Sequence, residues 1–286
     1  MKTTKLVAAI AGMWIGGVVI AQTVAVLEHP QCKETKERVV RPLFFFTPNG
    51  WHSLKSVHDT GRHVSSWRGL DASATPFVVE TLKAPPIPKD DWVFVRDYFL
   101  TPQNASELPR LPNTRKKYAG WCEPPPNKPI VLVSANSPTP KRLQLETTQP
   151  DEVDKERILR ALIKTYDSKR LCTNEEKPKP VRLRASDLVF EANIQMATGS
   201  RLVGVNLKRP VFECDSELGA TDLPRWFSIA REVRYLGKAM ELIDAIDVHS
   251  SGGATFFFWY SGYNEDGYVL LDQSLEKPVR YTWKYH

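Results

Sequence analysis

The sequence lacks the short motifs that mark the common enzyme classes. It contains no G-x-G-x-x-G or Walker phosphate loop, no H-E-x-x-H pair, no calcium loop and no G-x-S-x-G elbow. It also has no internal repeat of fixed period. Nucleotide binding, zinc-dependent proteolysis, EF-hand calcium binding and α/β-hydrolase chemistry therefore have no support in the sequence. A site assembled from residues that are distant in sequence stays open.

Excess charge is also scarce. The 286 residues carry a formal net charge of +6, with a sequence pI near 9.0. A nucleic-acid binder usually concentrates far more positive charge on one face, so we expect no nucleic-acid partner. With 42% hydrophobic and 25% charged residues, the composition is that of an ordinary globular protein and excludes disorder throughout the chain.

Cysteine is rare, but its number and positions are informative. The closest spacing is the 42 positions from Cys172 to Cys214, which does not suit a tetrahedral zinc site because such sites use close pairs. An even number after an apolar N-terminal segment favours disulfides in an oxidising compartment. Of three connectivities we expect Cys172–Cys214 and Cys32–Cys122, because the first would close a predicted hairpin against a predicted helix. One disulfide or free buried thiols are the alternatives. We expect no metal and no cofactor.

The apolar N-terminal segment is the strongest single feature of the sequence. Lys2 and Lys5 precede an uncharged run from Leu6 to Leu27, which is typical of an export signal. Small residues at Ala21 and Ala25 offer two cleavage positions. We therefore predict that the protein is exported, either to the periplasm or out of the cell. The run could instead be a retained anchor over residues 6–27, with the main part outside the cytoplasm and no other membrane contact, or a buried core helix.

Proline divides the remaining chain. Of 22 prolines, 14 lie between Pro76 and Pro150, which favours extended loops that join short strands. Aromatic and β-branched residues predict five strands in this half, at residues 39–46, 77–82, 92–99, 130–134 and 142–146.

The second half is more regular. A helix is predicted to begin at Pro150, with Ile158, Leu159, Leu162, Ile163 and Tyr166 on one face. Strict alternation then predicts a hairpin of residues 188–196 and 201–207, with Phe190, Ala192 and Ile194 facing one core and Asn193 pointing away from it. A second helix is predicted from Leu223 to about Ile246, followed by strands at 255–260, 268–271 and 279–285.

These patterns predict the fold class. It is α+β, with a mainly antiparallel sheet, two principal helices and a Pro-rich, loop-heavy N-terminal half. The predicted division is a signal peptide or membrane anchor at 1–25, a Pro-rich part with short strands at 26–150 and an α+β part at 151–286. Residues 26–286 could also form one domain.

Histidines supply the weak candidates for a metal site. His52, His58 and His63 lie in one polar stretch, and clustered imidazoles can bind zinc or copper. Their spacing matches no helical or strand face that would aim all three rings at one point, so a solvated loop is the preferred interpretation.

His249-Ser250-Ser251-Gly252-Gly253 brings together a base, hydroxyls and backbone amides, as serine hydrolysis requires. Sequence neighbours rarely have the necessary geometry, and the glycines are explained by a turn.

Two functional hypotheses follow. The preferred one is an exported, noncatalytic protein that binds a protein or an envelope polymer in the cell envelope or outside the cell. The alternative is an exported hydrolase with a site assembled from distant residues, in which His52, His63 or His249 is the base.

Overall fold

Antiparallel strands dominate the structure of the chain. The computed structural model describes residues 22–28, 39–54, 64–81, 98–99, 128–145, 147–166, 171–173, 177, 179–209, 211–214, 223–262 and 265–284. Within these ranges the strands form four sheets, and there is one α-helix together with a short 3₁₀ turn. The predicted class is therefore correct in being rich in antiparallel sheet, whereas the second principal helix is absent from the described residues.

The N-terminal sheet has seven strands. Its order is β3-β2-β1-β7-β4-β5, with β6 paired to β2, and all of its pairings are antiparallel. The strands are β1 (Thr23–Glu28), β2 (Val39–Thr47), β3 (Gly50–Ser53), β4 (Ser66–Leu70), β5 (Pro76–Glu80), β6 (Tyr98–Phe99) and β7 (Ile130–Ser134). The end of the predicted apolar segment is thus a central strand of this sheet.

Three further sheets follow. The central sheet, of order β19-β18-β17-β16-β8, comprises β8 (Lys141–Arg142), β16 (Met240–Asp247), β17 (Thr255–Gly262), β18 (Glu265–Leu271) and β19 (Val279–Lys284). The hairpin sheet, of order β11-β12-β14-β15, comprises β11 (Leu188–Gln195), β12 (Arg201–Leu207), β14 (Arg225–Ile229) and β15 (Val233–Gly237). The small sheet comprises β9 (Leu171–Thr173), β10 (Pro180–Val181) and β13 (Val211–Glu213).

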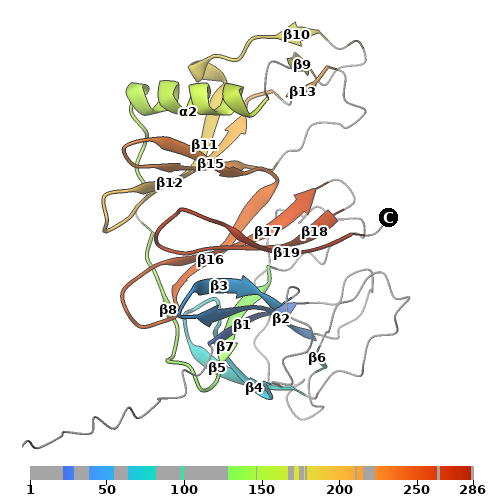
Figure 1. Cartoon of the computed structure of the whole chain (residues 1–286), viewed down its shortest axis with the longest axis vertical. Coiled ribbons are helices and arrows are strands. Elements are labelled where there is room, and N and C mark those ends of the chain that lie inside the picture. The colour runs from blue at the N-terminus through green and yellow to red at the C-terminus, as the bar shows by residue number, and fades with distance from the viewer. Residues whose placement is uncertain are drawn as a thin grey trace, which may run out of the picture.

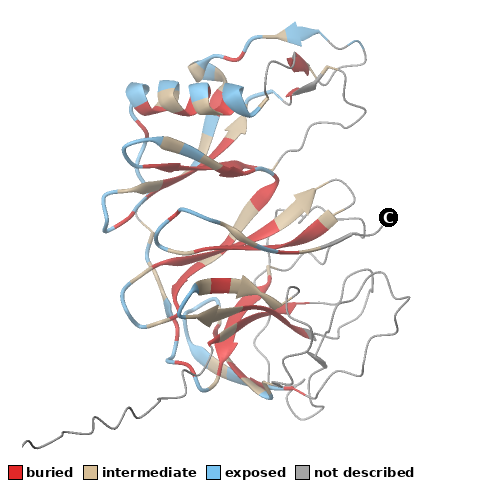
Figure 2. Ribbon diagram, in the orientation of Figure 1, coloured by how far each residue is buried: buried red, intermediate tan, exposed pale blue. Residues whose placement is uncertain are grey.

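The sheets are stacked in layers along the long axis of the molecule (Figure 1). The N-terminal sheet packs on one face of the central sheet, and the hairpin sheet packs on the other. Strand β17 shows why: Phe257 and Trp259 lie in the first core, whereas Phe256 and Phe258 lie in the second. A strand covered on both faces is apolar at consecutive positions, and buried residues accordingly fill this layer in Figure 2.

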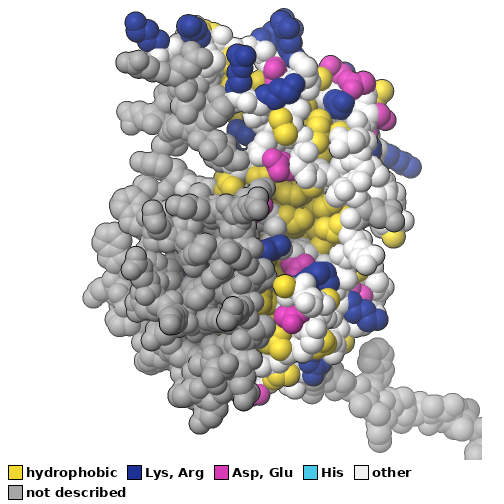
Figure 3. Space-filling model, turned by 180° about the vertical axis from the view of Figure 1, so that it is seen from behind, with side chains coloured by type: hydrophobic (Ala, Val, Ile, Leu, Met, Phe, Trp, Pro, Cys, Tyr) yellow, Lys and Arg dark blue, Asp and Glu magenta, His cyan; other side chains and the backbone are white. Residues whose placement is uncertain are grey.

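The helix α2 (Glu152–Thr165) covers the outer face of the hairpin sheet (Figure 1). Its N-cap is Asp151, whose side chain accepts from the backbone N–H of Asp154 at 2.7 Å, so the helix begins just after the predicted Pro150. Its side chains Ile158 and Leu162 are fully buried, as the sequence pattern predicts, but Ile163 is exposed. Figure 3 shows the molecule from behind. On the side that it shows, many Lys and Arg side chains lie at the end of the molecule that carries α2, and apolar side chains are exposed near the middle.

The predicted hairpin is confirmed as β11 and β12, but one of its facing assignments is wrong. A bulge between Phe190 and Ala192 shifts the register, so that Phe190 packs in the core beneath α2 whereas Ala192 and Ile194 pack in the core against the central sheet. Asn193, expected to point away from the core, is 1% exposed. Its Nδ2 donates to Thr148 Oγ1 at 3.0 Å.

The predicted second helix is wrong. Residues 225–246 form β14, β15 and most of β16. Trp226 faces the core against the central sheet, where its indole covers Gly204 and its Nε1 donates to the carbonyl of Met240 at 2.8 Å; the next residue, Phe227, faces α2. Because both faces of the hairpin sheet are covered, apolar residues on adjacent positions mimic the spacing of a helix.

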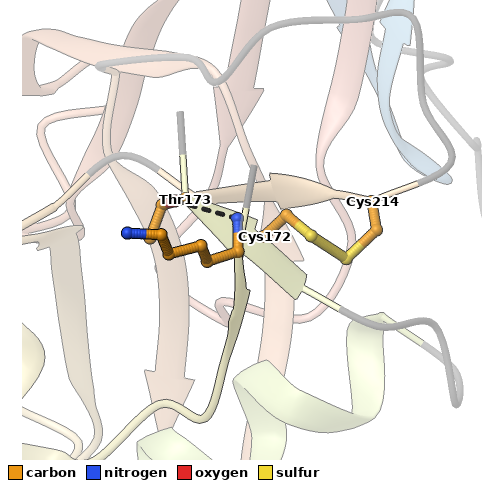
Figure 4. The surroundings of a disulfide bond; sticks show 4 residues. Cys172, Thr173 and Cys214 are labelled. Carbon is orange, nitrogen blue, oxygen red and sulfur yellow. Dashed lines mark hydrogen bonds between the residues drawn. A yellow bond between two sulfur atoms is a disulfide. The ribbon is translucent and has the colours of Figure 1, made fainter. Parts of the chain in front are cut away.

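The Cys172–Cys214 disulfide is present as predicted (Figure 4). Cys172 lies in β9 and Cys214 directly follows β13, the strand that pairs with β9, and the two Cα atoms are 4.9 Å apart. The bond therefore joins β9 to the end of β13 in the small sheet, and the loop that it closes contains β11 and β12. Cys32 and Cys122 lie outside the described residues, so their pairing stays a prediction.

In the described part of the chain, no helix is long and apolar enough to cross a membrane. The run from Leu6 to Ala21 lies outside that part. The predicted division into 1–25, 26–150 and 151–286 also stays a prediction.

Candidate functional site

The three clustered histidines are not brought together in the described structure. His52 lies on β3, where its ring stacks on Phe45 at a centroid distance of 5.3 Å and its Nε2 is 3.0 Å from Thr47 Oγ1. His58 and His63 lie outside the described residues. Over the residues that the structure does describe, no group of three or more His, Cys, Asp or Glu side chains could hold a metal ion.

A different histidine forms a cluster that the sequence did not indicate. Phe46 of β2, Trp51 of β3 and His249 of the β16–β17 loop, here called the aromatic corner, bring the N-terminal and central sheets together. The ring centroids are 5.2 Å apart for Phe46 and Trp51, 4.5 Å for Phe46 and His249, and 5.5 Å for Trp51 and His249. Trp51 is buried, whereas Phe46 and His249 are half-buried and reach the surface.

The loop that carries His249 is folded around one carboxylate. Asp247, which is 3% exposed, accepts backbone N–H groups from His249 at 3.1 Å, Ser251 at 3.1 Å and Gly252 at 2.7 Å. Ser250 and Gly252 both have positive φ, at 55° and 80°, which the tight loop requires. Residues 247–252, here called the Asp247 loop, thus have a fixed path.

This arrangement removes the basis for serine hydrolysis at the His249–Gly253 cluster. The amides of Ser251 and Gly252 point at the Asp247 carboxylate and are not available to stabilise an oxyanion. Within the described residues, the His249 imidazole contacts aromatic rings and makes no hydrogen bond to a carboxylate or a hydroxyl.

Burial decides the charge state of the imidazole. It lowers the pKa of His249 below the ordinary value of 6.5, and the negative charges of Asp247 and Asp272 oppose that shift only in part. His249 is therefore neutral at pH 7, which suits a ring packed between two aromatic side chains.

Gln22 holds the aromatic corner in place through two hydrogen bonds. Its backbone carbonyl accepts the N–H of Phe46 at 2.8 Å, and its side-chain amide donates to the carbonyl of Val248. Gln22 is 8% exposed, so both bonds are shielded from water. One residue at the start of β1 thus connects the strand that carries Phe46 to the residue preceding His249.

A buried cluster of charged and polar side chains lies at the other end of β1. Arg41, which is 0% exposed, donates its Nε to Glu28, and Tyr268 of the central sheet donates its hydroxyl to the same carboxylate. All three groups are buried, and their hydrogen bonds join the N-terminal and central sheets.

Comparisons with known proteins do not identify the chain: no family model, no curated protein and no solved structure matches it.

Proposed function

We propose that this protein is exported and noncatalytic, and that it binds a protein or an envelope polymer through the aromatic corner and the Asp247 loop. The observation that carries the proposal is the composition of this surface. Two half-buried rings, Phe46 and His249, stand on a buried Trp51, and exposed Ser250, Ser251 and Gly252 lie beside them on a fixed loop. Apolar rings with one polar edge are typical of binding surfaces.

Pre-organisation supports the same conclusion. A loop whose amides are already bonded to a buried carboxylate loses little conformational freedom when a partner binds, so less of the interaction free energy is spent on ordering it. The Cys172–Cys214 disulfide supports an oxidising compartment.

The hydrolase alternative has weaker support. A general base needs hydrogen-bond contact with the group it deprotonates. The His52 Nε2 atom already has a partner on its own hairpin, Thr47 Oγ1, and the half-buried His249 ring packs against Phe46 and Trp51.

Site-specific crosslinking tests the proposal. A photoreactive amino acid placed at Asn49 or at Ser250, both exposed beside the aromatic corner, should give a discrete adduct in the cells or medium where the protein is native. The same amino acid at Lys164, on the exposed face of α2, should not. Equal adducts from all three positions, or none, would contradict the proposal.

A matched pair of histidine variants adds a second measurement. His249→Ala removes a ring contact at the corner and should weaken binding of the captured partner about three- to tenfold, the range expected for one aromatic contact. His52→Ala removes a comparable half-buried ring elsewhere on β3 and should leave binding unchanged. Equal loss in both variants would place the binding surface elsewhere.

A further inference from the structure

The start of the first strand bears on how the chain is processed. Strand β1 pairs with β2 on one side and with β7 on the other. Val24 lies in the core between the two large sheets, and Ala25 lies in the core on the opposite face; both are 0% exposed. Cleavage after Ala25 would remove half of a central strand together with a side chain from each of two cores.

The fold also fixes the residue before the strand. The Gln22 carbonyl accepts the N–H of Phe46, a member of the aromatic corner, and its side chain donates to Val248, the residue before His249. A mature chain must keep Gln22 to keep these bonds. The last position at which the leader can end without loss to the described fold is therefore Ala21.

The same strand shortens the possible membrane anchor. If residues 23–27 belong to the sheet, the uncharged run that is free to cross a bilayer is the sixteen residues from Leu6 to Ala21. As a helix it would be about 24 Å long, shorter than the roughly 30 Å hydrocarbon core. A run of this length is close to the apolar region of a cleaved export signal.

We infer that an export peptidase hydrolyses the Ala21–Gln22 bond and that Gln22 is the N-terminus of the mature protein. The amide C–N bond breaks, the oxygen of one water molecule becomes the second carboxylate oxygen of Ala21, and both hydrogens of that water end on the Gln22 nitrogen, which becomes an ammonium group. Val19 and Ala21 stand at the positions where such peptidases accept small side chains. This inference shares with the proposed function only the premise of export.

The test uses the full chain, tagged at its C-terminus and expressed in a secretion-competent host. Mass spectrometry of the intact exported protein and of its N-terminal peptide should identify a chain that begins at Gln22. A chain that begins at Val26 or retains Met1 overturns the inference.

Two variants make the test site-specific. Ala21→Phe places a large side chain at the proposed cleavage position and should leave a precursor with its leader attached. Thr23→Arg disrupts the competing Thr23-Val24-Ala25 position at a partly exposed residue and should be processed like the wild type. The inference fails if Thr23→Arg blocks processing or if Ala21→Phe does not.

These outcomes separate from those of crosslinking. A mature chain that begins at Gln22 but gives no adduct at Asn49 or Ser250 would retain the cleavage site and remove the proposed function. Adducts from a chain that begins at Val26 would support the proposed function and overturn the cleavage site.

Discussion

Replacing Asp247 by Asn should destabilise the protein through the loop that it organises. The carboxylate offers both oxygens: Oδ1 accepts from His249 and Ser251, and Oδ2 accepts from Gly252. The amide of Asn keeps one acceptor oxygen and turns the other position into a donor. The shortest bond, to Gly252 at 2.7 Å, would then face an N–H group.

The magnitude follows from the number and the exposure of these bonds. A hydrogen bond to a charged group contributes roughly 1.5–3 kcal/mol when it is buried. Ser251 and Gly252 are exposed, so water can replace part of what their amides lose. Loss of one bond and weakening of the other two should lower the free energy of unfolding by about 2 kcal/mol.

Urea unfolding followed by tryptophan fluorescence measures this loss, and Asp272→Asn is the matched control. Asp272 also carries a negative charge that acts on His249, but its bonds to Ser274 are exposed. The Asp272→Asn substitution should lower the free energy of unfolding by less than about 0.5 kcal/mol, as is usual for surface substitutions. Equal losses in the two variants would refute the argument, because charge alone would then explain the effect. Amide hydrogen exchange should accelerate at Ser251 and Gly252 only in Asp247→Asn.

Three further changes test the rest of the structure. Cys172→Ser with Cys214→Ser opens a loop with a sequence separation of 42 and should lower the free energy of unfolding by about 4 kcal/mol, as denaturant titration would record; a loss below about 1 kcal/mol would contradict the loop-closure argument. Asn193→Asp should cost several kcal/mol in the same assay, because a carboxylate would replace a buried donor, whereas exposed Gln195→Glu should cost little. Because the pKa of His249 is lowered in the folded state, the unfolded state binds a proton first as pH falls below about 6.5. Below that pH the free energy of unfolding should decrease by at most about 1.4 kcal/mol per pH unit. A His249→Gln variant whose free energy of unfolding keeps the full pH dependence would contradict this.

The fold could be predicted where an element has a solvent-exposed face or a marked turn. Helix α2 has an exposed side, so its apolar residues recur at helical spacing, and the hairpin of β11 and β12 is marked by its Thr198–Ser200 turn. The prediction failed over residues 225–246, where cores lie on both faces and alternation disappears. Strand β1 was not predicted, because buried sheet and export signal are both apolar and the sequence shows no boundary between them.

The candidate site was only partly visible in the sequence. His249 and its glycines were noted, but Phe46 and Trp51 lie about two hundred positions earlier, and no local spacing connects them to it. The role of Asp247 could have been suspected, since an acidic residue directly before a Ser/Gly-rich turn often accepts the amides of that turn. Neither the bulge between Phe190 and Ala192 nor the contact of Asn193 with Thr148 had a signal in the residue pattern.

The position of β1 also has a consequence for the order of events in folding. Gln22 bonds to Val248, 226 positions later, and Glu28 accepts from Tyr268, 240 positions later. Strand β1, the first of the described strands to be synthesised, therefore cannot complete its contacts until almost the whole chain is available. Closure over such distances makes folding slow, because loop entropy is lost before the contacts form. Delayed folding would keep the chain extended long enough to be threaded across a membrane before its core assembles.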